Sequence, residues 1–299
     1  MSQKILLFYK FSPVKDPDEA RKWQTVVTAE RGLNGRVIIS RHGINATLGG
    51  DLEALEDYIE QLESTELADF RNIEYKWSNG GYDDFPKLSV KVRKELVTLD
   101  PEEEFDVYDS GTPLKPEEWH EFMINNPDVT VLDARNNYES DIGKFRGAVT
   151  PNIDKFKEIK PHLDKLDKEK PLITYCTGDV RCEYLSAYMK HKGFKDVYHL
   201  DGGIIKYGEK FADEGLWDGS CYVFDKRIGL NFSGQTKEIA NCTFCENKTS
   251  KYRNCANSLC NKRLLVCREC ETKIVCNEQC EKLRSKQQAN SRSTTGAVS

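Results

Sequence analysis

The chain has 299 residues, enough for two or three domains of roughly 100–200 residues each. Its composition, 38% hydrophobic and 31% charged, is typical of a soluble globular protein. The sequence has neither the roughly 18 consecutive apolar residues of a membrane helix nor a signal peptide. We therefore expect a cytoplasmic protein. The net charge is −5, but residues 221–299 carry 14 Lys and Arg against 7 Asp and Glu, which fits either an anionic macromolecular partner or a solvated basic tail.

Residues 1–95 are predicted to form a ferredoxin-like (acylphosphatase-like) α+β domain. Apolar patterns indicate strands at 4–10, 35–40, 44–48, 73–77 and 88–92, with helices at 16–31 and after Asp51. Asp51 is expected to cap the second helix. Four apolar residues are expected on one face of the first helix: Ala20, Trp23, Val26 and Val27. The order β-α-β-β-α-β defines the ferredoxin-like arrangement.

A second domain is predicted at residues 113–220, after an acidic, turn-rich linker at 96–112. Helices are expected at 116–126 and 180–192, and short buried strands at 129–132, 172–175 and 197–200. Strands that alternate with helices favour a parallel sheet, and therefore an α/β fold. The rest of the chain divides into a connector, a cysteine-rich module and a polar tail expected to be disordered, at 221–235, 236–283 and 284–299.

The loop that follows the strand at 172–175 carries the candidate nucleophile, Cys176. A tight loop at a helix start turns backbone N–H groups toward one point, where the helix dipole adds positive potential. A thiolate or persulfide on Cys176 would be stabilised there, and Arg181 adds a permanent charge, so we take both as catalytic candidates. The other loop residues of the candidate site are Thr177, Gly178, Asp179, Val180 and Cys182. The simpler alternative is a buried structural cysteine.

Three residues near this loop leave alternatives open. If the Asp179 carboxylate faces the sulfur, it raises the pKa of Cys176, and if it faces solvent it matters little. Cys182 could resolve a persulfide or sulfenate as a disulfide, or could simply pack within the helix. His199 is the nearest acid–base candidate, with a buried structural histidine as the alternative.

Three segments resemble the rhodanese family over about residues 113–218. They are the Cys176 loop, Leu132-Asp133-Ala134-Arg135 followed by Tyr138-Glu139, and Leu200-Asp201-Gly202-Gly203. The resemblance implies that Cys176 carries sulfur as a persulfide, and we expect Asp133 and Arg135 to support the loop. Four residues separate Cys176 from Arg181, where related phosphatases have five, which argues against a phosphatase. Asp179 departs from the glycine that rhodaneses usually have.

Eight of the 11 cysteines fall in the C-terminal module, as the pairs Cys242/Cys245, Cys255/Cys260, Cys267/Cys270 and Cys276/Cys280. Without a secretion signal, clustered cysteines indicate metal or catalysis, and two pairs have the Cys-x-x-Cys spacing of zinc ligands. We therefore predict two structural zinc sites of four cysteines each, paired either sequentially or in a cross-brace. The alternative is unligated or reactive cysteines.

The order of these parts resembles the rhodanese-containing tRNA uridine hydroxylase family of bacteria. Gly43-Ile44-Asn45-Ala46 and the segment 88–95 add to the match, which covers about residues 4–280. The resemblance implies an oxidoreductase that hydroxylates the wobble uridine of tRNA at C5, with molecular oxygen as co-substrate and Cys176 at the nucleophile position. Two other functions remain open: a thiosulfate or persulfide sulfurtransferase, and a non-enzymatic RNA- or partner-binding protein with a relic rhodanese loop.

Overall fold

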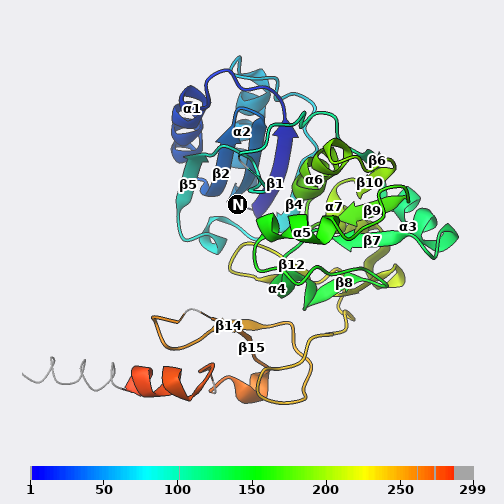
Figure 1. Cartoon of the computed structure of the whole chain (residues 1–299). Coiled ribbons are helices and arrows are strands. Elements are labelled where there is room, and N and C mark those ends of the chain that lie inside the picture. The colour runs from blue at the N-terminus through cyan, green and yellow to red at the C-terminus, as the bar shows by residue number, and fades with distance from the viewer. Residues whose placement is uncertain (1, 101, 261, 273, 286–299) are drawn as a thin grey trace, which may run out of the picture.

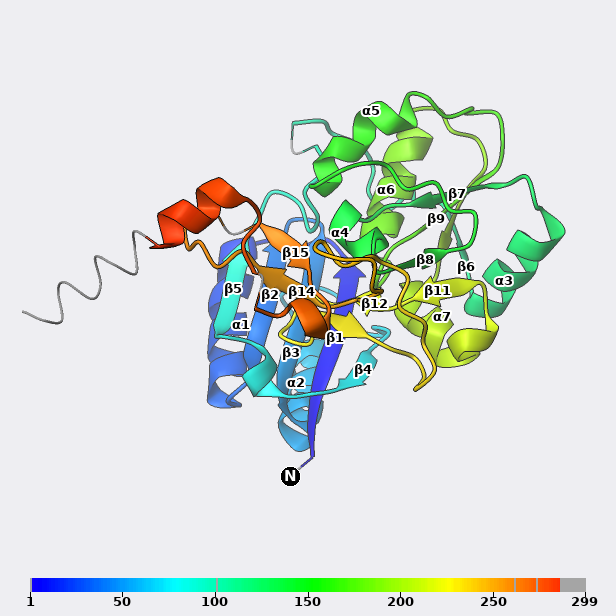
Figure 2. The same ribbon diagram turned by 90° about the horizontal axis from the view of Figure 1, so that it is seen from below.

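The computed structural model describes residues 2–100, 102–260, 262–272 and 274–285. An N-terminal α+β domain lies beside a parallel-sheet domain, and the cysteine-rich module lies below them (Figure 1). The view from below places this module in front of the region where the two domains meet (Figure 2). Among the described residues, none of the helices combines the length and hydropathy that a bilayer crossing requires.

The N-terminal domain is a five-stranded sheet with the order β4-β1-β3-β2-β5, in which only β2 and β5 run parallel. Its elements are β1 (Gln3–Phe11), α1 (Pro17–Glu30), β2 (Asn34–Ser40), β3 (Gly43–Asp51), α2 (Leu52–Ser64), β4 (Lys76–Asn79), the short helix η1 (Tyr82–Asp84) and β5 (Leu88–Val92). Leu6 and Phe8 of β1 enter the core under both helices. Side chains alternate along a strand, so Leu7 and Tyr9 project from the opposite face of β1, toward the second domain. The ferredoxin-like order is confirmed.

Local details of this domain differ from the sequence prediction. Val26 is 54% exposed, while Gln24 is buried in α1 and its side-chain oxygen accepts a 2.8 Å hydrogen bond from Tyr58. A pattern based on hydrophobicity treats polar residues as exposed, so it could not predict that Gln24 is buried with Tyr58 as its partner. Asp51 is at the N-cap of α2 but forms no side-chain capping bond, whereas Asp16 caps α1. The strand expected at 73–77 forms at Lys76–Asn79.

The second domain is built on a parallel sheet with the order β6-β10-β9-β7. Its strands are β6 (Thr112–Leu114), β7 (Thr130–Asp133), β9 (Leu172–Tyr175) and β10 (Val197–Leu200). The helices are α3 (Pro116–Asn125), α4 (Asn137–Ser140), α5 (Lys160–Leu163), α6 (Val180–His191) and α7 (Gly203–Phe211), with 3-10 turns at Phe156–Ile159 and Ala212–Glu214. A small antiparallel pair joins β8 (Gly143–Phe145) to β11 (Trp217–Gly219). The domain has two hydrophobic cores. Buried side chains of α6 belong to the first, and Trp119 of α3 and Tyr207 of α7 belong to the second.

The acidic stretch at 96–112 packs against the second domain through a few apolar residues. Leu99 and Val107 are each 2% exposed and join the core beside α6. The buried Glu95 carboxylate accepts hydrogen bonds from the amides of Leu99 and Asp100 and from the hydroxyl of Tyr184. A few apolar residues thus anchor a segment whose overall composition is that of a linker.

The connector forms a short hairpin of β12 (Cys221–Tyr222) and β13 (Gly229–Leu230), and the module contains β14 (Tyr252–Asn254), β15 (Arg263–Leu265) and the 3-10 turn η4 (Arg268–Cys270). Tyr252 packs in one cluster with Ile142 and Tyr222, and the Arg263 guanidinium lies 4.2 Å from the Tyr138 ring centroid. The module is therefore docked on the second domain. Residues 278–285 are helical. The tail expected to be disordered was predicted at 284–299, and this is wrong for residues 284 and 285, which are helical. The rest of that prediction, from residue 286 onward, lies outside the described residues.

Candidate active site and metal centres

The candidate loop lies where the sequence places it, between the end of β9 and the start of α6. The first turn of α7 holds its backbone, because the amides of Ile204 and Ile205 donate to the carbonyls of Cys176 and Thr177 at 3.0 and 3.2 Å. Gly203 has φ +68°, and a Cβ atom there would lie 2.7 Å from both carbonyl oxygens. Only glycine allows this close approach, which gives a physical reason for the Gly202-Gly203 pair.

The Cys176 sulfur is buried, yet its environment favours the thiolate. Burial is the largest influence and raises the pKa. Hydrogen bonds from the Cys182 thiol and the Arg181 backbone amide, with the charge of the Arg181 guanidinium, outweigh burial and lower the pKa of Cys176 to about 6. Burial, and then the hydrogen bond to Cys176, raise the pKa of Cys182. Cys182 is therefore the thiol that donates, and Cys176 is the sulfur that ionises.

The Arg181 guanidinium does not face an open anion site. It forms a two-pronged ion pair with Glu139, with Nη1–Oε1 and Nη2–Oε2 distances of 2.7 Å. The Glu139 side chain is fully buried and that of Arg181 is 10% exposed. Glu139 had no assigned role in the sequence analysis, although it belongs to the segment after Arg135 that resembles rhodaneses. In this structure Arg181 stabilises the loop through Glu139, and its charge still reaches Cys176.

Asp179 adopts neither of the two orientations considered from the sequence. It is 1% exposed with φ +79°, a left-handed conformation that aspartate tolerates better than most residues. One carboxylate oxygen lies 2.8 Å from His199 Nδ1, and the other accepts a 2.9 Å hydrogen bond from the Tyr9 hydroxyl. Burial lowers the pKa of His199, but the Asp179 charge and hydrogen bond outweigh it and raise the pKa to about 9. His199 is therefore protonated at neutral pH and neutralises Asp179.

The N-terminal domain forms one wall of the site. The Tyr9 hydroxyl of β1 lies 2.7 Å from Glu183 Oε2, as well as bonding Asp179. Leu7 packs so closely on the loop that a Cβ atom at Gly178 would lie 2.9 Å from its Cδ2. Neither Tyr9 nor Leu7 was expected in the site from the sequence. The sequence did offer one signal for them. Leu7 and Tyr9 are large side chains on the face of β1 that points away from the core of the N-terminal domain, so they were available to contact another domain.

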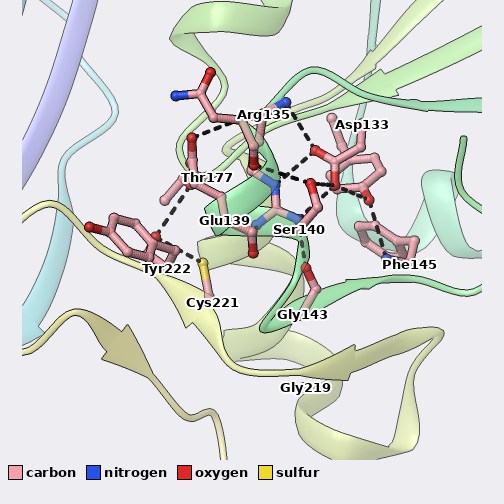
Figure 3. Close-up of polar contacts among 12 residues, drawn as sticks. Asp133, Arg135, Glu139, Ser140, Gly143, Phe145, Thr177, Gly219, Cys221 and Tyr222 are labelled. Atoms are coloured by element: carbon pink, nitrogen blue, oxygen red, sulfur yellow. Dashed lines mark hydrogen bonds and ion pairs between the residues drawn. The ribbon is translucent and has the colours of Figure 1, made fainter. Parts of the chain in front are cut away.

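Asp133 and Arg135 lie behind the loop in a buried polar network (Figure 3). Arg135 Nη2 lies 2.7 Å from Asp133 Oδ2 and also donates to the carbonyl of Gly143, and Tyr175 donates to the same Asp133 oxygen at 2.6 Å. Because Tyr175 directly precedes Cys176, this network supports the prediction that Asp133 and Arg135 brace the Cys176 loop. Thr177 faces the connector, with its hydroxyl 3.4 Å from the Tyr222 carbonyl (Figure 3). Burial raises the pKa of the neighbouring Cys221 to about 12.

The eight C-terminal cysteines assemble into two groups of four. Cys242, Cys245, Cys267 and Cys270 form one group, and Cys255, Cys260, Cys276 and Cys280 form the other. Within each group the sulfur atoms lie within 4.8 Å of one another, a spacing that fits four thiolates around one tetrahedral ion. In chain order, the first and third cysteine pairs therefore share one site, and the second and fourth pairs share the other. Of the two pairings left open by the sequence, the structure has the cross-brace.

Together, these domains define a rhodanese-like domain joined to an acylphosphatase-like domain and a cysteine-rich module. Three family models match in the same order: "UPF0176 acylphosphatase like domain" at residues 3–96, "Rhodanese-like domain" at 116–210 and "Rhodanase C-terminal" at 218–281. Solved structures that match single domains include the following two. The rhodanese-like domain protein of Staphylococcus aureus is 22% identical with a TM-score of 0.29, covering 32% of this chain and 91% of its own. The acylphosphatase of Bacillus subtilis is 17% identical with a TM-score of 0.25, covering 30% and 98%.

Relatives that match almost the whole chain include the following two. The tRNA uridine(34) hydroxylase of Arthrobacter sp. (strain FB24) is 45% identical over 293 residues, which cover 93% of this chain and 98% of the relative. That of Corynebacterium kroppenstedtii is 47% identical over 277 residues, covering 89% and 93%. The chain belongs to the tRNA uridine(34) hydroxylase family, which confirms the resemblance found in its sequence.

Proposed function

We propose that this protein hydroxylates uridine 34 of tRNA at C5, with molecular oxygen as co-substrate and Cys176 as the nucleophile. The observation that carries the proposal is the match, at 45% identity and over 98% of its length, to a protein named for this reaction. A cysteine whose pKa is lowered to about 6 at the start of a helix supports it. The two four-cysteine groups would hold structural zinc, because sulfur ligands in tetrahedral sets of four favour that ion.

Cys176 would act by adding to the uracil ring. A thiolate that bonds to C6 pushes electron density onto C5 and O4, so that C5 becomes nucleophilic toward oxygen. When the C5 proton is lost, the C6–sulfur bond breaks and the thiolate is released. A cysteine ionised at neutral pH suits this step, because the thiolate is the reactive form.

The electron balance assigns a second role to the neighbouring thiol. Insertion of one atom of dioxygen at C5 leaves the other to be reduced to water, which requires two electrons and two protons. Cys176 and Cys182, whose sulfurs are hydrogen-bonded, would supply the two electrons by forming a disulfide. One proton would come from the Cys182 thiol and the other from solvent, because Cys176 reacts as the thiolate. The overall change is uridine, dioxygen and two thiols to 5-hydroxyuridine, water and a disulfide. An external thiol reductant would then regenerate the pair.

Nucleoside analysis of tRNA tests the proposal. Purified protein would be incubated with tRNA that carries uridine 34, in air and without oxygen, and the digested RNA analysed by mass spectrometry. We expect 5-hydroxyuridine only in air, loss of product in Cys176→Ser and retained product in Cys221→Ser, a buried cysteine outside the loop. No product from the wild type, together with rapid transfer of sulfur from thiosulfate to cyanide, would instead establish a sulfurtransferase.

A further inference from the structure

A cavity beside the loop is lined by all three parts that meet there. Leu7 and Trp77 come from the N-terminal sheet, Thr177 and Ile205 from the loop and α7, and Phe224 from the connector. We propose that this cavity binds the uracil ring of uridine 34. The inference rests on the proposed function and names the place where its substrate base is held.

The wall of the cavity includes a residue of the Cys176 loop. Thr177 directly follows Cys176, and Ile205 donates its amide to the Thr177 carbonyl at 3.2 Å. The walls leave about 50 Å³ for the centres of water molecules. At about 10–15 Å³ for each water, this is room for about four, the scale of one six-membered ring and smaller than a whole nucleotide.

Two aromatic side chains give this cavity the character of a base site. Trp77 is half-buried and Phe224 is 52% exposed, so the Phe224 ring is accessible from solvent. The Phe224 ring lies 5.6 Å from the Arg181 guanidinium carbon, between the loop and solvent. Proteins that act on bases of single-stranded RNA unstack the base and hold it against aromatic or apolar side chains. An anticodon loop presents position 34 in that unpaired state.

An ion pair within the connector and a hydrogen bond to β4 hold the aromatic wall in place. Arg227 forms a double ion pair with Asp225, at 2.8 and 2.6 Å, and donates to the carbonyl of Asn79 in β4 at 2.6 Å. The Asp225 side chain is only 2% exposed, so this contact is part of the packed structure. It fixes the connector, and with it Phe224, to the strand that carries Trp77.

Thr177 is one of the polar residues in the wall of the cavity, and its hydroxyl could bind the edge of the base. Its hydroxyl lies 3.4 Å from both Glu139 Oε2 and the Tyr222 carbonyl. Both distances exceed the usual 2.5–3.0 Å of an O–H···O hydrogen bond. The hydroxyl can therefore exchange these long contacts for a shorter one to O4 or N3–H of uracil.

Photo-crosslinking tests the site directly. The probe is an anticodon stem-loop RNA with 4-thiouridine at position 34, irradiated with the zinc-loaded full chain, and the crosslinked peptides are located by mass spectrometry. We expect crosslinks within 76–78 or 222–227. On the unmodified uridine RNA, Phe224→Ala should lower kcat/KM about tenfold or more through loss of base stacking, and Phe224→Tyr should retain it. Tyr108→Ala, which removes an aromatic ring exposed outside the cavity, should have no effect.

The outcomes separate the two proposals. Crosslinks confined to other segments, with hydroxylation unchanged in Phe224→Ala, overturn the cavity and leave the proposed function standing. Crosslinks at 222–227 without any hydroxylation by the wild type overturn the proposed reaction and retain the base site. Because Phe224 is exposed, its replacement by alanine should leave the fold intact, which circular dichroism would check.

Discussion

His199 Nδ1 lies 2.8 Å from Asp179 Oδ1, so a protonated imidazole neutralises the carboxylate within the Cys176 loop. An unpaired carboxylate there would oppose ionisation of Cys176, and Asp179 does act in that direction. The second Asp179 oxygen is bound by Tyr9, from a strand 170 residues away in the sequence. The loop can therefore contain aspartate where rhodaneses usually have glycine, because two other elements compensate for its charge.

Replacement of His199 should raise the pKa of Cys176. His199→Gln keeps a polar side chain but removes the positive charge, so the Asp179 carboxylate acts on the sulfur without compensation. The pKa would be measured from the far-ultraviolet absorbance of the thiolate, as the difference between each protein and its Cys176→Ser form. Adding Asp179→Asn to His199→Gln should lower the pKa again. An unchanged pKa in His199→Gln would show that the pair does not control the sulfur.

The same pair should make stability depend on pH. The pKa of His199 is about 9 in the fold, against 6.5 for a free histidine, because Asp179, Glu183 and Asp201 favour its charged form over burial. A raised pKa gives stabilisation that is complete below pH 6.5 and is lost as pH rises through 9. The unfolding free energy of the wild type, relative to His199→Gln, should therefore fall by up to about 3 kcal/mol across this interval. Urea unfolding at several pH values measures it, and a constant difference contradicts the assignment.

Replacement of Glu139 should act on Cys176 in the opposite direction. Glu139→Gln removes the charge that compensates Arg181, so the guanidinium should favour the thiolate more strongly and lower the pKa of Cys176. Because one partner of a buried ion pair is lost, the unfolding free energy should also fall, by about 3 kcal/mol. The control is Glu102→Gln, whose exposed ion pair with Lys94 should contribute 1 kcal/mol or less. A raised Cys176 pKa in Glu139→Gln would contradict this account.

The sequence predicted what local patterns determine. The bounds expected for β9 and β10 agree with the structure, since short apolar runs between turns define buried strands. The position of Cys176 between strand and helix followed from the same pattern. Val26 shows the limit of such patterns, because hydrophobicity assigned it to a buried face that Gln24 occupies instead.

The partners of the loop residues could not be read from the sequence. Tyr9 meets Asp179 only because β1 turns one face toward the second domain, and Glu139 meets Arg181 only once α4 and α6 pack together. These contacts depend on tertiary arrangement, not on spacing along the chain. The pairing of the cysteines is similar, since the spacing Cys-x-x-Cys identifies ligands but not which pairs share an ion.

The cross-braced pairing predicts which cysteines a single substitution releases. In zinc-loaded protein, Cys242→Ser should remove about one metal ion per chain and expose Cys245, Cys267 and Cys270 to alkylation. Sequential pairing would expose Cys245, Cys255 and Cys260 instead. Elemental analysis gives the metal content, and peptide mass spectrometry gives the alkylated positions. Cys255→Ser is the matched control, because it should expose only the second group.

The thiol pair can be tested by counting electrons in a single turnover. Reduced protein in excess over tRNA, in air and without added thiol, should form one disulfide between Cys176 and Cys182 for each 5-hydroxyuridine. Cys182→Ser keeps a hydroxyl that can donate to Cys176, so the thiolate should persist while the second electron donor is lost. We expect this variant to give at least tenfold less product in the absence of thiol. Full product from Cys182→Ser, or product without thiol loss in the wild type, would exclude the pair as the electron source.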